Sequence, residues 1–237
     1  MRPAMLTICA ALLSGSAATS FAAPIVELYT SQGCYSCPPA DKYLAQLISE
    51  NPDLVALEFH VDYWDDLNYG AAGIWKDPFS NAEYSQRQRN YNARALKGKR
   101  GVYTPQIIIN GHTAQVGTSS GAIKKALHVA VPPLEIQAKQ SGNDVTISID
   151  GSRSDARLWM AVFDRLQITD VKNGENQGKV MRNHHVVREL TPLADLFDSS
   201  YTTTVTVPAL AQENSGCAVF LQEKNNGPML AAGYCSP

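Results

Sequence analysis

A Cys-x-x-Cys motif at residues 34–37 lies between a predicted strand and a predicted helix, and this placement constrains the fold of the first half of the chain. Residues 25–29 (Ile-Val-Glu-Leu-Tyr) predict a short buried strand. After Cys37, two prolines lead into apolar residues spaced like one face of a helix: Ala40, Leu44, Leu47 and Ile48. The cysteines therefore open a helix, where free backbone N–H groups and the helix dipole stabilise a thiolate.

This location favours a reactive cysteine pair, because the thiolate is the attacking species in disulfide exchange. We predict that Cys34 is the nucleophile and the more exposed sulfur, and that Cys37 is the resolving thiol. The two intervening residues let the second sulfur reach the first and release a mixed disulfide. A permanently oxidised structural bridge is the alternative, since exported proteins often keep disulfides for stability alone.

Residues 1–22 predict a cleaved secretory signal peptide. Arg2 gives a positive start, an apolar stretch rich in small residues follows, and Ser20-Phe21-Ala22 fits the small-x-small rule for cleavage before Ala23. We therefore expect a secreted or periplasmic protein with no stable membrane span after cleavage. The formal net charge of −2 comes without any basic stripe, which argues against nucleic-acid partners.

Residues 23–131 predict alternating strands and helices in the order β-α-β-α-β-β-α. After the first strand and helix, residues 54–61 form an apolar strand, and a capping box at residues 80–83 opens a helix ending near residue 96. Residues 106–109 and 113–116 form a hairpin around Asn110-Gly111, and a last helix follows Ser119 or Ser120.

Residues 132–237 predict an all-β, sandwich-like domain, because helical periodicity largely disappears after Val131-Pro132-Pro133. The expected strands are residues 134–138, 145–149, 157–163, 201–207, 217–222 and 230–234. Cys217 and Cys235 flank a predicted hairpin and fall nearly opposite each other, which predicts a structural disulfide. A second redox pair is the alternative.

The element order, with Cys-x-x-Cys opening the first helix, resembles the thioredoxin fold. That resemblance implies a cis Thr104–Pro105 bond beside the cysteines, since this pair precedes the strand entering the 106–116 hairpin. We expect Tyr103, Thr104 and Pro105 to face the substrate, with backbone groups that can pair with an extended peptide. The resemblance also implies that Glu27, on the first strand, accepts a proton from Cys37; a partly solvated structural role is the alternative.

At family level the sequence resembles a secreted thioredoxin-like family catalogued as domain of unknown function 1223. The motifs that carry this resemblance are residues 26–34, 37–41, 60–65, 103–106, 174–178 and 186–188. The family implies a fold and an export route, and no substrate. Residues 68–74 depart from the family pattern as an apparent insertion.

Other polar residues carry weaker signals. His60, Asp62 and Asp65 follow the second strand, and residues of this kind more often fix loops than catalyse. His184 and His185 have no cysteine or acid at a ligand spacing, so no metal site is predicted and both are expected at the surface.

The sequence thus predicts an exported thiol–disulfide oxidoreductase that acts on protein or peptide disulfides and thiols. It needs no cofactor, and its redox partner is unidentified. Two alternatives remain: a binding protein for copper or another soft metal, held by the two thiolates, or a non-catalytic adaptor with a structural disulfide.

Overall fold

The computed structural model describes residues 23–95, 101–128, 134–151, 155–196 and 200–237. The first half alternates strands and helices. Its elements are β1 (Ile25–Thr30), α1 (Pro38–Glu50), β2 (Val55–His60), the 3₁₀ turn η1 (Gly70–Ala72), α2 (Ala82–Ala95), β3 (Gln106–Ile109), β4 (Thr113–Val116) and α3 (Ser120–Leu127). Pro38 and Pro39 begin α1, where a missing N–H costs nothing.

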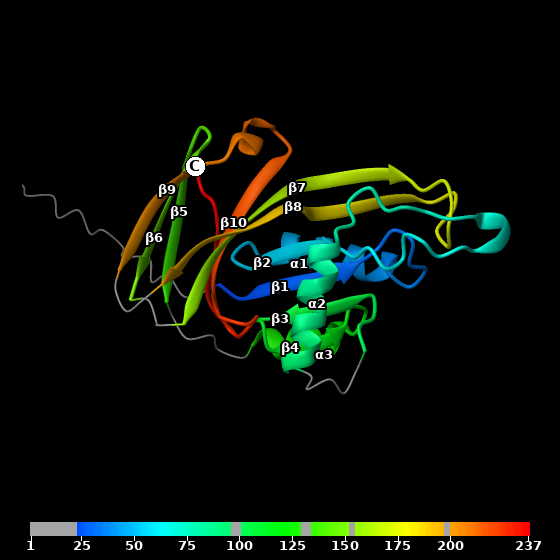
Figure 1. Cartoon of the computed structure of the whole chain (residues 1–237), viewed down its shortest axis with the longest axis horizontal. Helices are drawn as coiled ribbons and strands as arrows, with labels where there is room; N and C mark the ends of the chain where they lie inside the picture. Colours follow the sequence, from blue (N-terminus) through cyan, green and yellow to red (C-terminus); the bar gives the residue numbers. More distant parts are fainter. Residues whose placement is uncertain (1–22, 96–100, 129–133, 152–154, 197–199) are drawn as a thin grey trace, which may run out of the picture.

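The second half consists mainly of strands. They are β5 (Glu135–Ser141), β6 (Asp144–Asp150), β7 (Ala156–Asp170), β8 (Val180–Leu196), β9 (Tyr201–Thr206), β10 (Ser215–Glu223) and β11 (Met229–Tyr234), with the 3₁₀ turn η2 (Pro208–Ala211) before β10. β7 and β8 are unusually long, at 15 and 17 residues, and pair with each other along most of their length. They form an arm that reaches across the first half of the chain (Figure 1).

The strands form two sheets. An eight-stranded mixed sheet has the order β11-β10-β7-β8-β2-β1-β3-β4, and a three-stranded sheet has the order β5-β6-β9. The large sheet is continuous because β8 joins the edge of β2 in parallel, with Val186 opposite Glu58. Strands from both halves of the sequence therefore share one sheet (Figure 1).

This architecture shows that the predicted fold class, an α/β thioredoxin-like domain followed by an all-β sandwich-like domain, is wrong. The described chain is mostly β, with three α-helices against eleven strands, and its main sheet is built from both halves. The sequence reasoning missed β8, which is the strand that joins the halves. β8 has many polar and half-buried positions, so it lacks the simple alternation that identifies a strand.

Helices cover both faces of the first-half strands, and strand alternation decides which residues each helix contacts. On one face, Val26 and Leu28 pack with α1 and with Ile123 of α3. On the other, Ile25 and Tyr29 pack with α2. The two faces of β1 therefore lie in separate environments, one below α1 and one below α2.

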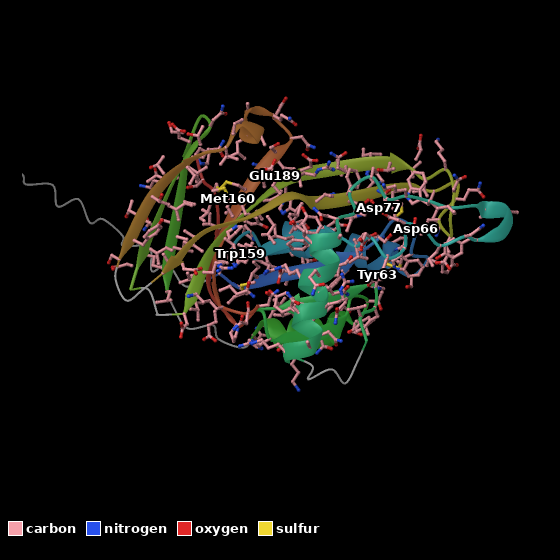
Figure 2. All side chains as sticks on the ribbon, in the orientation of Figure 1. Tyr63, Asp66, Asp77, Trp159, Met160 and Glu189 are labelled. Carbon is pink, nitrogen blue, oxygen red and sulfur yellow. A yellow bond between two sulfur atoms is a disulfide. The ribbon has the colours of Figure 1, made fainter. Side chains whose placement is uncertain are left out.

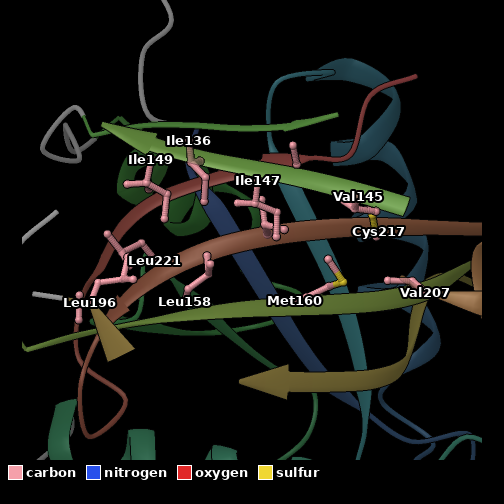
Figure 3. Packing of buried hydrophobic residues seen from close by; sticks show 14 of the residues in the cluster. Ile136, Val145, Ile147, Ile149, Leu158, Met160, Leu196, Val207, Cys217 and Leu221 are labelled. Atoms are coloured by element: carbon pink, nitrogen blue, oxygen red, sulfur yellow. The ribbon is translucent and has the colours of Figure 1, made fainter. Parts of the chain in front are cut away.

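The three-stranded sheet packs against the far end of the large sheet. Its inward side chains, including Ile136, Val145 and Ile147, meet Leu158 and Met160 of β7 (Figure 3). Cys217 and Cys235 form a disulfide here that links β10 to the end of β11, with the Cα atoms 5.3 Å apart. This end of the molecule is a second, apolar core.

Two predicted boundaries fall outside the described residues: the signal peptide at residues 1–22 and the domain boundary at residues 131–132. Among the residues that the structure describes, no helix has the length and apolar character needed to cross a membrane.

We predict that Gly117→Ala lowers the free energy of unfolding by about 1–3 kcal/mol, because the added methyl group overpacks a tight contact. A Cβ at Gly117 would lie 2.8 Å from Cβ of Ala40 and 2.9 Å from Cβ of Pro105. Urea denaturation measures the change. Gly121→Ala is the matched control: no heavy atom lies within 4 Å of its Cβ, so its stability should be unchanged or slightly higher.

Candidate active site

Cys34 and Cys37 form a disulfide at the start of α1, with their Cα atoms 5.4 Å apart. Cys37 is the N-cap residue, and its carbonyl accepts bonds from the N–H groups of Ala40 and Asp41. The motif thus occupies the predicted place, between the end of β1 and the first turn of a helix. Its reduced form would experience the positive end of the α1 dipole.

Both cysteines are fully buried. The exposed fraction is 0% for Cys34 and for Cys37, whereas Tyr35 between them is 67% exposed. The prediction that Cys34 is the more exposed sulfur is therefore wrong for this disulfide-bonded state. Packing from other parts of the chain covers the pair.

Thr104 and Pro105 directly precede β3, and the peptide bond between them is cis. Gly117 packs closely against both Pro105 and Ala40, and Ala40 lies in the first turn of α1. Pro105 is therefore near the start of this helix. Trp64 links Thr104 to the residue before Cys34. Its Nε1 donates to Oγ1 of Thr104 at 2.8 Å, and its Cβ packs against Gly33. Sequence reasoning placed Thr104 and Pro105 at the site, but it missed Trp64.

Tyr103 is bound through its main chain to α2. Its carbonyl oxygen accepts a hydrogen bond from Nε2 of Gln88, at 2.8 Å. The same Gln88 amide donates to Oε1 of Gln106 at 2.8 Å. Tyr103 thus helps to attach the segment before β3 to α2.

Glu27 lies on the α2 face of β1, opposite the face that packs against α1. Its Oε1 accepts from Nε of Arg87 at 2.7 Å, and its Oε2 accepts from the Tyr91 hydroxyl at 2.5 Å. Arg87 also donates to Oε1 of Gln222, from β10, at 3.0 Å. The structure therefore does not bring Glu27 to Cys37. One of its oxygens is held in the buried ion pair with Arg87 and the other by the Tyr91 hydroxyl.

A different carboxylate lies on the α1 face. Asp41 follows Cys37 by four residues, which places both on one face of α1, and it is 2% exposed. Its Oδ1 accepts from the Thr30 hydroxyl at 2.7 Å, while its Oδ2 is buried without a hydrogen-bond partner among the described residues. Burial and then the neighbouring Glu58 carboxylate raise the pKa of Asp41 well above its ordinary value.

His60 and two carboxylates form a buried cluster at the ends of the parallel strands β1 and β2. Nδ1 of His60 is 2.7 Å from Oδ2 of Asp77, and its Nε2 is 3.3 Å from Oε1 of Glu58. Burial opposes the charged ring, but the two carboxylates outweigh it and raise the pKa of His60 to about 10. Asp77 also accepts from the N–H of Gln32 at 2.7 Å, so the cluster fixes the segment leading to Cys34.

The carboxylates of Asp62 and Asp65 form hydrogen bonds that hold the loop after β2, as the sequence predicted. Asp62 accepts from the Ser85 hydroxyl near the start of α2, and Asp65 accepts from the Ser80 hydroxyl and from the N–H of Asp77. Asp77, labelled in Figure 2, lies in the same region as the labelled Tyr63 and Asp66. This loop therefore holds Asp77 against His60.

His184 and His185 are half-buried, so the expectation of surface positions is wrong. The N–H of His184 donates to Oε2 of Glu58 at 2.8 Å. Nδ1 of His185 lies 3.0 Å from the carbonyl oxygen of Ala56, and burial lowers the pKa of His185 to about 4. Both histidines thus support the junction of β8 with β2. Among the described side chains, no group of three His, Cys, Asp or Glu residues has a metal-binding arrangement.

The tip of the β7–β8 hairpin, residues 171–179, lies against the cysteine loop. Nδ2 of Asn176 donates to the carbonyl oxygens of Gln32 and Cys34, both at 2.8 Å. Oε2 of Glu175 accepts from the N–H of Tyr35 at 2.8 Å. Sequence reasoning had singled out Gly174-Glu175-Asn176 as a motif but gave it no role, because no local pattern reports a contact across 142 residues.

The apparent insertion at residues 68–74 contacts the same hairpin tip. It is closed by a bridge between Asn68 and Ile74 and contains η1. The N–H of Gly174 donates to the carbonyl oxygen of Ala72 at 2.8 Å. The insertion therefore also supports the hairpin tip.

A family described as a protein of unknown function, DUF1223, matches residues 25–222. The chain belongs to the DUF1223 family. A crystal structure of protein AGR_C_4864 from Agrobacterium tumefaciens is 31% identical to this DUF1223 chain, with a TM-score of 0.77. The match covers 92% of this chain and 96% of the other.

A second solved structure similar to this DUF1223 protein is HBP35 of Porphyromonas gingivalis. It has 12% identity and a TM-score of 0.59, and the match covers 90% of this chain and 74% of that one. At that identity the likeness concerns the fold alone. No curated protein matches the sequence significantly.

We predict that Glu27→Gln lowers the free energy of unfolding by about 3 kcal/mol, because it leaves the buried Arg87 guanidinium without its counter-charge. Thermal or urea denaturation checks the change, with exposed Glu213→Gln as the control. Thiol–disulfide exchange of the folded variant should match wild type. A stable variant with slow exchange would restore Glu27 to the mechanism.

Proposed function

We propose that this protein is an exported thiol–disulfide oxidoreductase that acts on protein or peptide thiols and disulfides through Cys34 and Cys37. The observation that carries the proposal is the disulfide at the first turn of α1, with Ala40 of that turn and Pro105 both packed close to Gly117. A helix start stabilises the thiolate that exchange requires. Disulfides form and persist in oxidising compartments, so the two present here are compatible with export.

The chemistry is a reversible two-electron exchange. A substrate thiolate attacks Sγ of Cys34, the Cys34–Cys37 bond breaks, and Cys37 leaves as a thiolate that takes up a proton. A second substrate thiolate then attacks the substrate sulfur of the mixed disulfide, and Cys34 leaves. The substrate is now oxidised and the cysteine pair is a dithiol. An external disulfide partner then returns the pair to its disulfide state and is itself reduced to two thiols.

Asp41 is the group best suited to exchange the proton of Cys37. It lies one turn after Cys37 on the same helix face, and it is buried with one oxygen unpartnered within the described structure. Its raised pKa favours the protonated acid, which supplies a proton when the Cys37 thiolate leaves. In the reverse direction, the Asp41 carboxylate accepts that proton.

A structural disulfide is the second candidate, and the complete burial of both cysteines favours it. In that case the bond would fasten the β1–α1 turn and undergo no turnover. The soft-metal alternative has no comparable support, because both sulfurs are engaged in the disulfide.

The deciding experiment measures the reduction potential of the Cys34–Cys37 pair by equilibration with glutathione, together with turnover of a mixed peptide disulfide. We expect a potential above about −300 mV, because lower values mark inert structural bridges. Turnover should disappear in Cys34→Ser. The double variant Cys217→Ser/Cys235→Ser should keep turnover while losing stability. A potential below about −300 mV without turnover would establish the structural role.

We further predict that Asp41→Asn slows the Cys37-dependent step about a hundredfold, because the amide cannot exchange a proton. Stopped-flow measurement across pH should also show a changed pH profile, which a purely structural effect would not produce. Exposed Asp53→Asn is the control. An unchanged rate and profile would remove Asp41 from the mechanism.

A further inference from the structure

Access to the disulfide requires a movement of the protein. Exchange needs the attacking sulfur to approach a cysteine sulfur directly, yet Cys34 and Cys37 are both 0% exposed. The neighbouring residues Tyr35 and Ser36 are exposed, so the loop itself lies at the surface. The cover over the sulfurs must therefore come from segments packed against this loop.

The hairpin tip, residues 171–179, bonds to the main chain on both sides of the Cys34 side chain. It bonds to three main-chain groups: the carbonyl oxygens of Gln32 and Cys34, through Asn176, and the N–H of Tyr35, through Glu175. Asn176 is itself fully buried in this contact. These bonds make the tip part of the cover over the cysteine loop.

The outer contacts of the tip are exposed to solvent. The ammonium group of Lys179 lies 4.6 Å from the ring centroid of Tyr35 and 2.7 Å from Oδ1 of Asn176. Glu175, Lys179 and Tyr35 are all exposed, and interactions at such positions contribute little stability individually. These outer contacts therefore add little resistance to opening, which depends mainly on the two bonds of the buried Asn176.

The tip is also a pre-formed unit. Four main-chain hydrogen bonds close it internally, among them Gly178 N–H to Val171 C=O and Gln177 N–H to Gly174 C=O. Gly174 and Gly178 have φ values of +75° and +81°, which glycine adopts without strain. The tip can therefore leave the cysteine loop without losing its own conformation.

The chemistry of the tip resembles that of a polypeptide backbone. The amide N–H of Asn176 acts as a backbone N–H would, and the oxygen of Glu175 accepts as a backbone carbonyl would. An extended peptide presents the same donors and acceptors at regular spacing, as in the addition of a strand to a sheet edge. The three main-chain groups that the tip occupies are thus suited to a peptide substrate.

We propose that the 171–179 tip is a gate that occupies the place of the substrate backbone, so that an extended polypeptide reaches Cys34 by displacing Asn176 and Glu175 from the cysteine loop. This inference rests on the proposed function, and it names the substrate as an extended polypeptide segment rather than a small thiol.

The test compares reduction of the two disulfides by the phosphine TCEP, with acid quenching and mass-tagging of the freed thiols. Because loss of one hydrogen bond shifts an equilibrium about five- to tenfold, Glu175→Ala should accelerate reduction of Cys34–Cys37 by about that factor. Asn176→Ala removes two bonds to the cysteine loop and should accelerate it more. Gln177→Ala is the matched control, since this exposed side chain bonds within the tip, to the carbonyl oxygen of Lys172.

The Cys217–Cys235 disulfide is an internal reference for unfolding, and its reduction rate should not change. Equal acceleration of both disulfides, or no acceleration in either variant, would overturn the gate. Glu175→Ala is at an exposed position and keeps the test valid if Asn176→Ala folds poorly.

Peptide turnover gives the second readout. If the tip competes with the substrate, Glu175→Ala should lower KM for a peptide disulfide several-fold, because more of the protein is in the open state. A raised KM would mean that Glu175 binds the substrate, which contradicts the proposal. TCEP reduction does not depend on turnover, so failure of the gate and failure of the oxidoreductase proposal give different results.

Discussion

The buried carboxylate of Glu58 connects the two halves of the molecule. Its two oxygens accept from Nδ2 of Asn183 at 2.6 Å and from the N–H of His184 at 2.8 Å, so β8 is attached to β2 by side-chain as well as main-chain bonding. Asn183 in turn accepts from Nε2 of Gln32, two residues before Cys34. Glu58 therefore links three segments: the edge of β2, the arm formed by β7 and β8, and, through Asn183, the cysteine loop.

Such a cluster is costly to bury, and its charges must be balanced. His60 between Asp77 and Glu58 supplies a positive charge, and the main-chain N–H of Gln32 satisfies Asp77 further. Replacing buried ions by apolar residues is often neutral or stabilising, so stability alone does not explain such a cluster. What it provides here is a fixed geometry: the bonds from Asn183 and His184 to Glu58 hold β8 on β2, and the tip of the same arm lies on the cysteine loop.

The sequence predicted the local features of this site and missed the long-range ones. The position of Cys34 and Cys37 at a helix start follows from residue spacing, as does the hairpin after Pro105. The hydrogen bond between Asn176 and the main chain of Cys34 joins residues far apart in the sequence, and no periodicity reports it. The resemblance to the thioredoxin fold assigned Glu27 to the cysteines, but Glu27 lies on the opposite face of β1 and pairs with Arg87 of α2.

β8 also could not be predicted from the sequence, because its residues are chosen by contacts far along the chain. Its side chains must satisfy Glu58 and Ala56 while also packing against apolar neighbours, so polar residues such as Asn183 and His185 stand at inward positions. A strand whose inward residues are polar gives no alternation to recognise. The prediction of a separate sandwich rested on the strands that do alternate. β8, which does not alternate, is the strand that joins the two halves.

The contact between Asn176 and Cys34 spans 142 residues, which has a consequence for the order of assembly. A chain made from its N-terminus at roughly 5–20 residues per second presents Cys34 and Cys37 roughly 7–28 seconds before Asn176 exists. During that interval nothing from the hairpin tip can cover the pair. The hairpin tip can therefore close over the pair only after the rest of the arm has been made, and until then no contact from the tip limits access to the two sulfurs.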